Sequence, residues 1–142
     1  MIQTGRAALA GRATATGTAR FAARHCAERQ PPDGRPAVHP AHYRSALGLT
    51  VASVGYGTSG GALSDDVDAA YRAAVAEVVG CGCNLLDTAP SYRAQRSEMA
   101  LGRAIADLVE AGACRRDELL VMSKGGLIPY HLQRPADPSI FS

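Results

Sequence analysis

The chain has 142 residues, of which 46% are apolar and 20% are charged, and its formal net charge is +2. This is ordinary globular composition, and so small a net charge argues against a nucleic-acid partner. No stretch approaches the roughly 18 consecutive apolar residues that a membrane-spanning helix needs, so no membrane partner is expected.

The charge is unevenly distributed along the chain. Residues 1–50 carry seven arginines against two acidic residues, a balance of +5, and the other residues carry eight basic against eleven acidic side chains, a balance of −3. Four prolines also fall within residues 1–45. We therefore predict a disordered or loosely structured leader at 1–45, with a helical turn around 17–25, followed by a folded domain at 46–142. The leader superficially resembles a transit peptide, but a flexible leader on a cytoplasmic protein is favoured.

The four cysteines are Cys26, Cys81, Cys83 and Cys114. Without an export signal, reduced thiols are expected rather than disulfides. Cys81 and Cys83 have a spacing that can bind soft metals, but no second pair of ligands accompanies them. We therefore expect no metal site, and a Cys-based metal or redox module remains a weaker alternative.

Strands and helices are expected to alternate after the leader. The stretch LTVASVGYGTSGG, at 49–61, is typical of a short strand that runs into a glycine-rich loop. The loop lacks the spacing of a phosphate-binding motif, which favours a simple backbone turn. A first helix is expected next, with Ser64 as its cap, three aspartates in its first turn, and Gly80 or Gly82 at its end.

Another strand, another helix and a third strand complete the pattern. The run CNLLDT, at 83–88, has no exposed face, as in a buried parallel strand. The amphipathic stretch at 97–112 predicts a helix that Ser97 caps and Gly112 ends. The segment ELLVMSKGG, at 118–126, has the character of another buried strand. This alternation predicts an α/β fold whose chemistry lies at the carboxyl ends of parallel strands.

Three polar residues are expected to meet at those strand ends. Asp87 ends the second strand, Lys124 ends the third, and Tyr92 lies on the loop after Asp87. Consecutive parallel strands are usually neighbours, so Asp87 and Lys124 should emerge side by side with Tyr92 in reach. Each residue alone would have an ordinary explanation as a loop cap or a surface side chain, but the three together favour a site.

Together these side chains would make a tuned acid. A free phenol has a pKa near ~10, and a nearby ammonium stabilises the phenolate and lowers that pKa. A carboxylate beside the lysine keeps the lysine charged and directs it. Such a set suits the protonation of an oxygen that gains negative charge, as in carbonyl reduction by hydride. Arg93 and Arg96, on the same loop, could attract an anion or simply be solvated.

From about Arg44 to Pro129, the sequence resembles the aldo/keto reductase family. The resemblance rests on LGLTVASVGYGTSGG, GCNLLDTAPSY, RSEMALGRAI and ELLVMSKGG, in that order. It implies the first three strands and two helices of a (β/α)8 TIM barrel, and NADPH-dependent reduction of a small-molecule aldehyde or ketone, or the reverse oxidation.

By this resemblance, Tyr92 is the proton donor, Lys124 lowers its pKa, and Asp87 pairs with Lys124. The same resemblance places Gly57, Thr58 and Asp87 near the cofactor.

Two departures from the family shape the expectations. None of His25, His39, His42 and His131 matches the family's catalytic histidine, so none is assigned. A complete barrel needs ~250 residues, so an incomplete barrel with an irregular leader is expected. The alternative function is therefore a non-catalytic fragment of such an enzyme, and self-association through an open sheet edge is expected.

Overall fold

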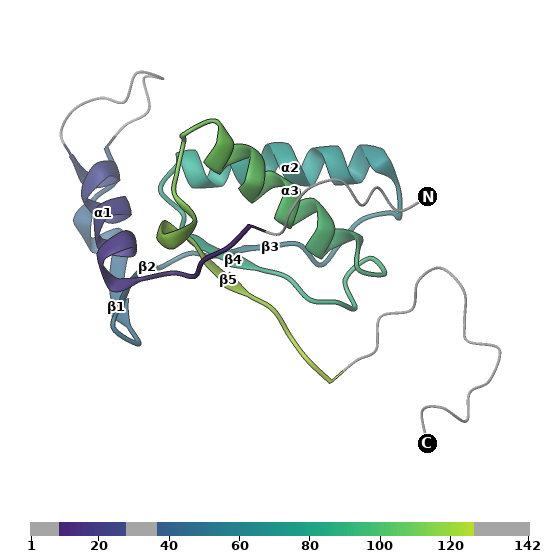
Figure 1. Ribbon diagram of the computed structural model, residues 1–142, viewed down its shortest axis with the longest axis horizontal. Coiled ribbons are helices and arrows are strands. Elements are labelled where there is room, and N and C mark those ends of the chain that lie inside the picture. Colours follow the sequence, from purple (N-terminus) through teal and green to yellow (C-terminus); the bar gives the residue numbers. More distant parts are fainter. Residues whose placement is uncertain (1–8, 28–36, 127–142) are drawn as a thin grey trace.

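The computed structural model describes residues 9–27 and 37–126, and its centre is a three-stranded parallel sheet (Figure 1). The strands are β3 (Tyr56–Gly57), β4 (Leu85–Asp87) and β5 (Leu120–Met122), and they lie in that order. The expected alternation of helices and parallel strands is confirmed, and the fold is mixed α/β.

Both long helices that join these strands lie on one side of the sheet (Figure 1). They are α2 (Asp65–Gly80) and α3 (Arg96–Glu110). Their apolar faces pack on Leu86, which is fully buried at the centre of β4. The core cluster consists of Phe21, Val75, Val79, Leu86, Leu101, Ala104, Ile105, Cys114 and Leu119.

The register of the sheet aligns the carboxyl ends of the strands. Gly57 pairs with Asp87, and Asp87 pairs with Met122. Side chains alternate between the faces of a strand, so these three residues lie on the face opposite to that of Leu86 and the helices. Met122 is 53% exposed there.

The expected helix ends are confirmed with one exception. The Ser64 hydroxyl accepts a hydrogen bond from the Val67 amide of α2 (3.4 Å), as predicted. Gly82 (φ +88°) and Gly112 (φ +70°) end α2 and α3 in the left-handed conformation that glycine readily adopts. Ser97 is not a cap, because α3 begins at Arg96 and the buried Ser97 hydroxyl donates to the Thr58 carbonyl instead (2.7 Å).

At 49–61, where one short strand running into a glycine-rich loop was predicted, the structure has two strands. The first part of this stretch forms β2 (Leu49–Ala52), which pairs antiparallel with β1 (Tyr43–Ala46), and only β3 belongs to the parallel sheet. The hairpin turn consists of Leu47 (φ +51°) and Gly48 (φ +75°), and positive φ at both positions matches the twist of a two-residue hairpin.

The leader contains more structure than the single helical turn predicted around 17–25. Helix α1 (Ala15–Cys26) spans three turns, and its Phe21 side chain is fully buried in the core cluster. A short helical turn, η1 (Pro40–His42), leads into β1. Helix α1 and the β1–β2 hairpin lie together at one end of the sheet (Figure 1). The domain boundary at residue 46 stays a prediction.

Two of the predictions concern residues 127–142, which lie outside the described part of the chain. They are the loop that holds His131 and the end of the match at Pro129. Among the helices of residues 9–27 and 37–126, none has the length and apolar character to cross a membrane.

Candidate active site

The carboxyl ends of β4 and β5 bring a carboxylate and an ammonium into contact. Lys124 follows β5 by two residues, and its Nζ donates to both carboxylate oxygens of Asp87, at 2.8 and 2.7 Å. Nζ also donates to the carbonyl oxygen of Thr88 (3.0 Å). The prediction that Asp87 and Lys124 emerge side by side is confirmed, because β4 and β5 are neighbours in the sheet.

The ring of Tyr92 completes the cluster. The Nζ atom of Lys124 lies 4.6 Å from the centre of that ring. The Asp87 carboxylate, and after it Tyr92, hold the pKa of Lys124 above its ordinary value. An ammonium with a raised pKa keeps its proton at neutral pH, so Lys124 presents a fixed positive charge to the ring of Tyr92.

We expect Asp87→Asn to lower the pKa of Lys124 toward its ordinary value of 10.5, because the Asp87 carboxylate is the main cause of the increase. Lys124 is the single lysine of the chain, so NMR titration of protein with isotopically labelled lysine gives one signal. Asp66→Asn, on the exposed side of α2, is the control and should leave the titration unchanged. An unchanged Lys124 pKa in Asp87→Asn would contradict the assigned pairing.

A set of buried hydroxyl groups forms a hydrogen-bonded network next to Asp87. The Thr58 hydroxyl donates to the hydroxyl of Thr88 (2.9 Å), next to Asp87, and lies 3.2 Å from the Asp87 carbonyl oxygen. The carbonyl of Thr58 accepts the hydrogen bond from Ser97 at the start of α3. Thr58, Thr88 and Ser97 are all almost fully buried. This network links the ends of β3 and β4 to α3, and sequence reasoning missed it because a buried threonine has no distinctive pattern.

The two residues predicted to lie near a cofactor differ in their surroundings. Gly57 is exposed at the carboxyl end of β3, and no atom lies within 4 Å of the point where a Cβ would sit. The backbone there is open to the close approach of a planar ring. Thr58 is fully buried and its hydroxyl has internal partners, so only Gly57 faces open space. The assignment of both residues to a cofactor stays a prediction.

The loop that carries Tyr92 has an unusual backbone. Arg93, Ala94 and Gln95 have φ values of +51°, +51° and +72°, and none of them is glycine. A left-handed conformation costs about 1–2 kcal/mol for each residue that has a Cβ. The sequence has no signal for this turn, because glycine is the residue that usually marks such positions.

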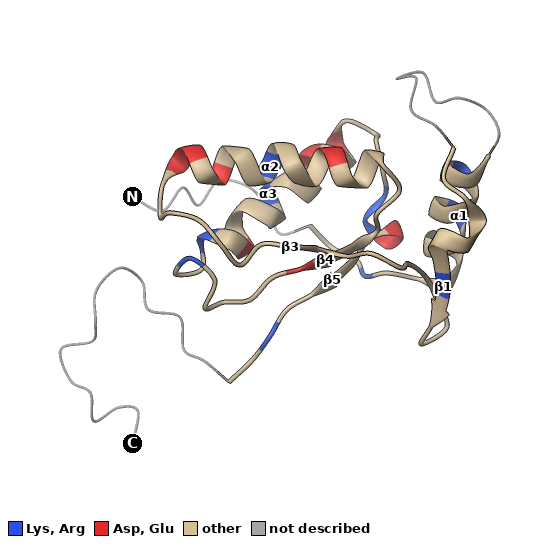
Figure 2. Ribbon diagram, turned by 180° about the vertical axis from the view of Figure 1, so that it is seen from behind, with Lys and Arg blue, Asp and Glu red and all other residues tan. Residues whose placement is uncertain are grey.

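The arginines of this loop are not solvated charges. Arg93 and Arg96 both pair with Asp68 of α2, and the acidic start of that helix lies near the basic residues that follow Tyr92 (Figure 2). Burial alone would raise the pKa of Asp68, but the hydrogen bonds from Arg96 and Arg93 and their charges outweigh burial and hold that pKa below its ordinary value.

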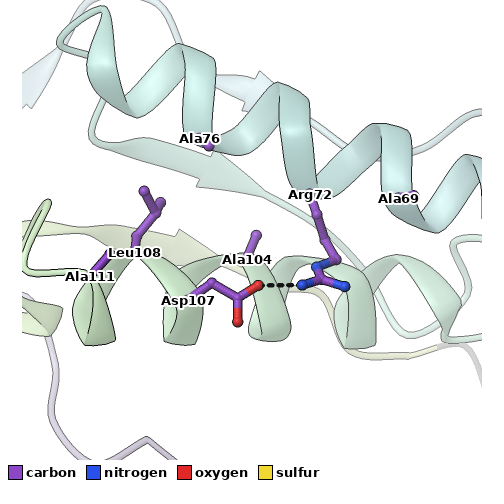
Figure 3. Close-up of a pocket in the computed structure, with 7 residues that line it drawn as sticks. All are labelled: Ala69, Arg72, Ala76, Ala104, Asp107, Leu108 and Ala111. Atoms are coloured by element: carbon purple, nitrogen blue, oxygen red, sulfur yellow. Dashed lines mark hydrogen bonds and ion pairs between the residues drawn. The ribbon is translucent and has the colours of Figure 1, made fainter.

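Two surface hollows lie away from the cluster. One, of about 430 Å³, lies between α2 and α3, where Arg72 pairs with Asp107 at 2.6 Å (Figure 3). The other lies beside Tyr56 and Tyr71.

Within residues 9–27 and 37–126, no group of three or more His, Cys, Asp or Glu side chains is placed to hold a metal ion. The thiol of Cys83 is buried and lies 3.2 Å from the Val54 carbonyl oxygen. These surroundings are those of a side chain that packs in the interior.

Comparison with known protein families gives a match. The sequence model of the aldo/keto reductase family matches residues 53–139, which is more than half of the chain. The match includes Asp87, Tyr92 and Lys124. Neither the search among curated proteins nor the search among solved structures found a match.

Proposed function

Because the chain belongs to the aldo/keto reductase family, a family of oxidoreductases that generally use NAD(P)H, we propose that it reduces an aldehyde or ketone with Tyr92 as the proton donor. One observation carries the proposal. The ammonium of Lys124 contacts the carboxylate of Asp87 on one side and the ring of Tyr92 on the other. A positive charge this close to the ring would stabilise the phenolate that proton donation leaves behind.

Each residue of the cluster has one role in this reaction. A reduced nicotinamide, when bound, would supply the hydride for the carbonyl carbon. The Tyr92 hydroxyl gives its proton to the carbonyl oxygen as that oxygen gains charge, so the carbonyl becomes an alcohol and Tyr92 becomes a phenolate. Lys124 stabilises the phenolate, and Asp87 keeps Lys124 charged and directed at the ring. The same groups in reverse oxidise an alcohol.

We propose NADPH as the cofactor, which Gly57 and Asp87 would help to hold. Support comes from the open backbone at Gly57, which is directly paired with Asp87 in the sheet. Thr58 contributes by holding the ends of β3 and β4 together. None of the four cysteines, all of which lie among the described residues, forms a disulfide, which is consistent with a cytoplasmic location, where thiols are kept reduced.

The test is an assay of the purified protein with NADPH and a panel of aldehydes and ketones. The proposal predicts loss of the reduced nicotinamide absorbance that depends on both the protein and the carbonyl compound. Parallel reactions with NADH test the choice of cofactor, and reactions without the carbonyl compound measure background oxidation. Absence of carbonyl-dependent oxidation with either cofactor would refute the proposal.

The second candidate is a non-catalytic member that keeps the fold of the family. The exposed apolar side chains of β5 favour it, since Val121 is 37% and Met122 is 53% exposed. Within residues 9–27 and 37–126, β5 has a neighbouring strand on one side only, and the Lys124 side chain beside it is 47% exposed. A protein that is folded by circular dichroism and inactive toward the whole panel would establish this alternative.

We also propose that the exposed edge of β5 pairs with a second copy of the chain. In the described residues β5 pairs only with β4, and an unpaired edge with apolar side chains is a template for strand addition. Sedimentation velocity should show an association that strengthens with concentration and weakens in Val121→Lys. Leu47→Lys, at the fully exposed tip of the hairpin, is the control and should associate as the unchanged protein does. A monomer at all concentrations would exclude this pairing.

A further inference from the structure

Among the described residues, the segment that follows Tyr92 is the one run of consecutive non-glycine residues with positive φ. Three successive residues with side chains, Arg93 to Gln95, have positive φ. This conformation is disfavoured by contacts between the side chain and the backbone, so it persists only where surrounding contacts enforce it. Ala94 has only a methyl group as its side chain. The side chain of Arg93, in contrast, makes several polar contacts.

The guanidinium group of Arg93 is buried and held by several acceptors. Its Nε and Nη2 donate to the Ala62 carbonyl oxygen, at 2.9 and 2.6 Å, and Nη2 is 3.2 Å from the Ser64 carbonyl oxygen. Nη2 also lies 2.7 Å from the carboxylate of Asp68. The side chain is only 2% exposed. It therefore ties the loop of Tyr92 to the loop after β3 and to the first turn of α2.

Further contacts fix the orientation of this anchor. Arg93 Cζ lies 5.3 Å from the centre of the Tyr71 ring, in the geometry of a cation–π contact. The other oxygen of Asp68 accepts a hydrogen bond from Arg96 Nη2 at 2.5 Å. The remaining nitrogen of Arg93, Nη1, is buried without a hydrogen-bond partner. Burying an unsatisfied donor is unfavourable. The placement of Arg93 therefore does not give the protein the greatest possible stability.

We propose that Arg93 is a positioning residue for Tyr92. Its buried guanidinium holds the left-handed turn in place, and the turn holds the ring of Tyr92 against Lys124. Arg93 and Tyr92 are adjacent in the chain, and the peptide bond between them is planar. A shift of the Arg93 backbone therefore moves Tyr92 directly. The catalytic consequence rests on the proposed function, whereas the geometric consequence does not. A displacement of about 1 Å in a reacting group can cost ~10²-fold in rate.

The position of the Tyr92 ring can be read from the single lysine. The Nζ atom of Lys124 lies over the ring. The circulating electrons of the ring should shift the NMR signals from the end of this side chain, and labelled lysine gives one set of such signals. A Tyr92→Leu protein supplies the reference without the ring. We expect Arg93→Met to move the Lys124 signals most of the way to that reference.

Two further variants separate positioning from general stability. Arg93→Gly removes the anchor but relieves the left-handed strain at that residue, and it should also lose most of the ring shift. Arg72→Met, which breaks the exposed pair with Asp107 between α2 and α3, is the matched control and should keep the full shift (Figure 3). The pKa of Lys124 should stay raised in Arg93→Met, Arg93→Gly and Arg72→Met, because Asp87 is the main cause of the increase. A raised Lys124 pKa in a variant shows that β4 and β5 are still paired.

The NMR result tests the positioning role of Arg93 whether or not the protein turns over a substrate. A full ring shift in folded Arg93→Met and Arg93→Gly proteins would overturn the positioning role, whatever the activity. Loss of the shift in both, with the Arg72→Met control unaffected, supports it. If the unchanged protein reduces a carbonyl compound, both Arg93 variants should lower kcat by about 10²-fold with little change in KM. An inactive unchanged protein would refute the proposed function alone.

Discussion

Replacing Tyr92 by Phe should lower kcat for carbonyl reduction by about 10²- to 10⁴-fold, the usual contribution of a positioned acid. The substitution removes the hydroxyl proton but keeps the ring that lies 4.6 Å from Lys124 Nζ. The fold and the contact between Lys124 and Asp87 should therefore be preserved. KM should change little, because the lost interaction is made in the transition state rather than with bound substrate. Steady-state kinetics with a carbonyl substrate found in the panel would measure both constants.

A tyrosine at the opposite end of the sheet supplies the control for this experiment. The Tyr43 hydroxyl donates to the Gly82 carbonyl (2.8 Å), before β4 begins, and so is remote from the carboxyl ends of the strands. Tyr43→Phe removes the same atom and should leave kcat unchanged. Equal losses in both variants would indicate a general effect on the fold. An unchanged kcat in Tyr92→Phe would show that the proton comes from elsewhere.

Replacing Glu118 by Ala should lower the free energy of unfolding by about 3 kcal/mol, the lower end of the range for removing one partner of a buried ion pair. Glu118 lies in the short helical turn η2 (Arg116–Glu118), and its side chain is 0% exposed. Its carboxylate accepts hydrogen bonds from Arg20 (2.9 Å), from both terminal nitrogens of Arg24 (3.0 Å each) and from the Arg115 amide (3.0 Å). The lower end applies because Arg20 and Arg24 stay partly hydrated, at 35% and 44% side-chain exposure.

Urea unfolding at neutral pH would measure this loss. Asp117→Ala is the matched control, because the Asp117 carboxylate pairs with Arg20 at 2.7 Å but is 36% exposed. Removing such a surface pair should cost only about 0.2–1 kcal/mol. Equal effects in the two variants would mean that Glu118 does not join α1 to the rest of the fold.

The same carboxylate predicts how stability depends on pH. Burial would raise the pKa of Glu118, but the hydrogen bonds from Arg24, the Arg115 amide and Arg20 outweigh it and hold that pKa below its ordinary value of 4.5. The folded state therefore binds this proton less readily than the unfolded state. The stabilisation is present above pH 4.5 and is lost as the pH falls through the lower folded pKa. Glu118→Gln should lose less stability over this acidic range than the unchanged protein.

The open edge of β5 and the proposed site are physically connected. Lys124 follows β5 by two residues, so a strand added at that edge would also cover the exposed side of the Asp87 and Lys124 pair. Exclusion of water strengthens the interaction between a charge and a developing phenolate. If the chain associates as proposed, turnover per subunit should therefore rise with protein concentration.

The sequence by itself determined the α2–β4–α3–β5 order and the meeting of Asp87 with Lys124. These features follow from local rules, because apolar residues spaced by three or four predict a helix and short unbroken apolar runs predict buried strands. Parallel neighbours then place consecutive strand ends together. Asp87 and Lys124 were predictable because Asp87 ends such a run and Lys124 follows the next one by two residues.

Only the tertiary structure decided the role of α1, the turn at 93–95 and the hydroxyl of Ser97. Each depends on partners that are remote in sequence. Helix α1 is held by the burial of Phe21 and by the pairing of Arg20 and Arg24 with Glu118, nearly a hundred residues later. The turn uses a conformation that its own residues disfavour, and its energy is offset by contacts to a preceding loop and helix. Local propensity carries no information about such contacts, because burial and charge pairing exist only once the chain has folded.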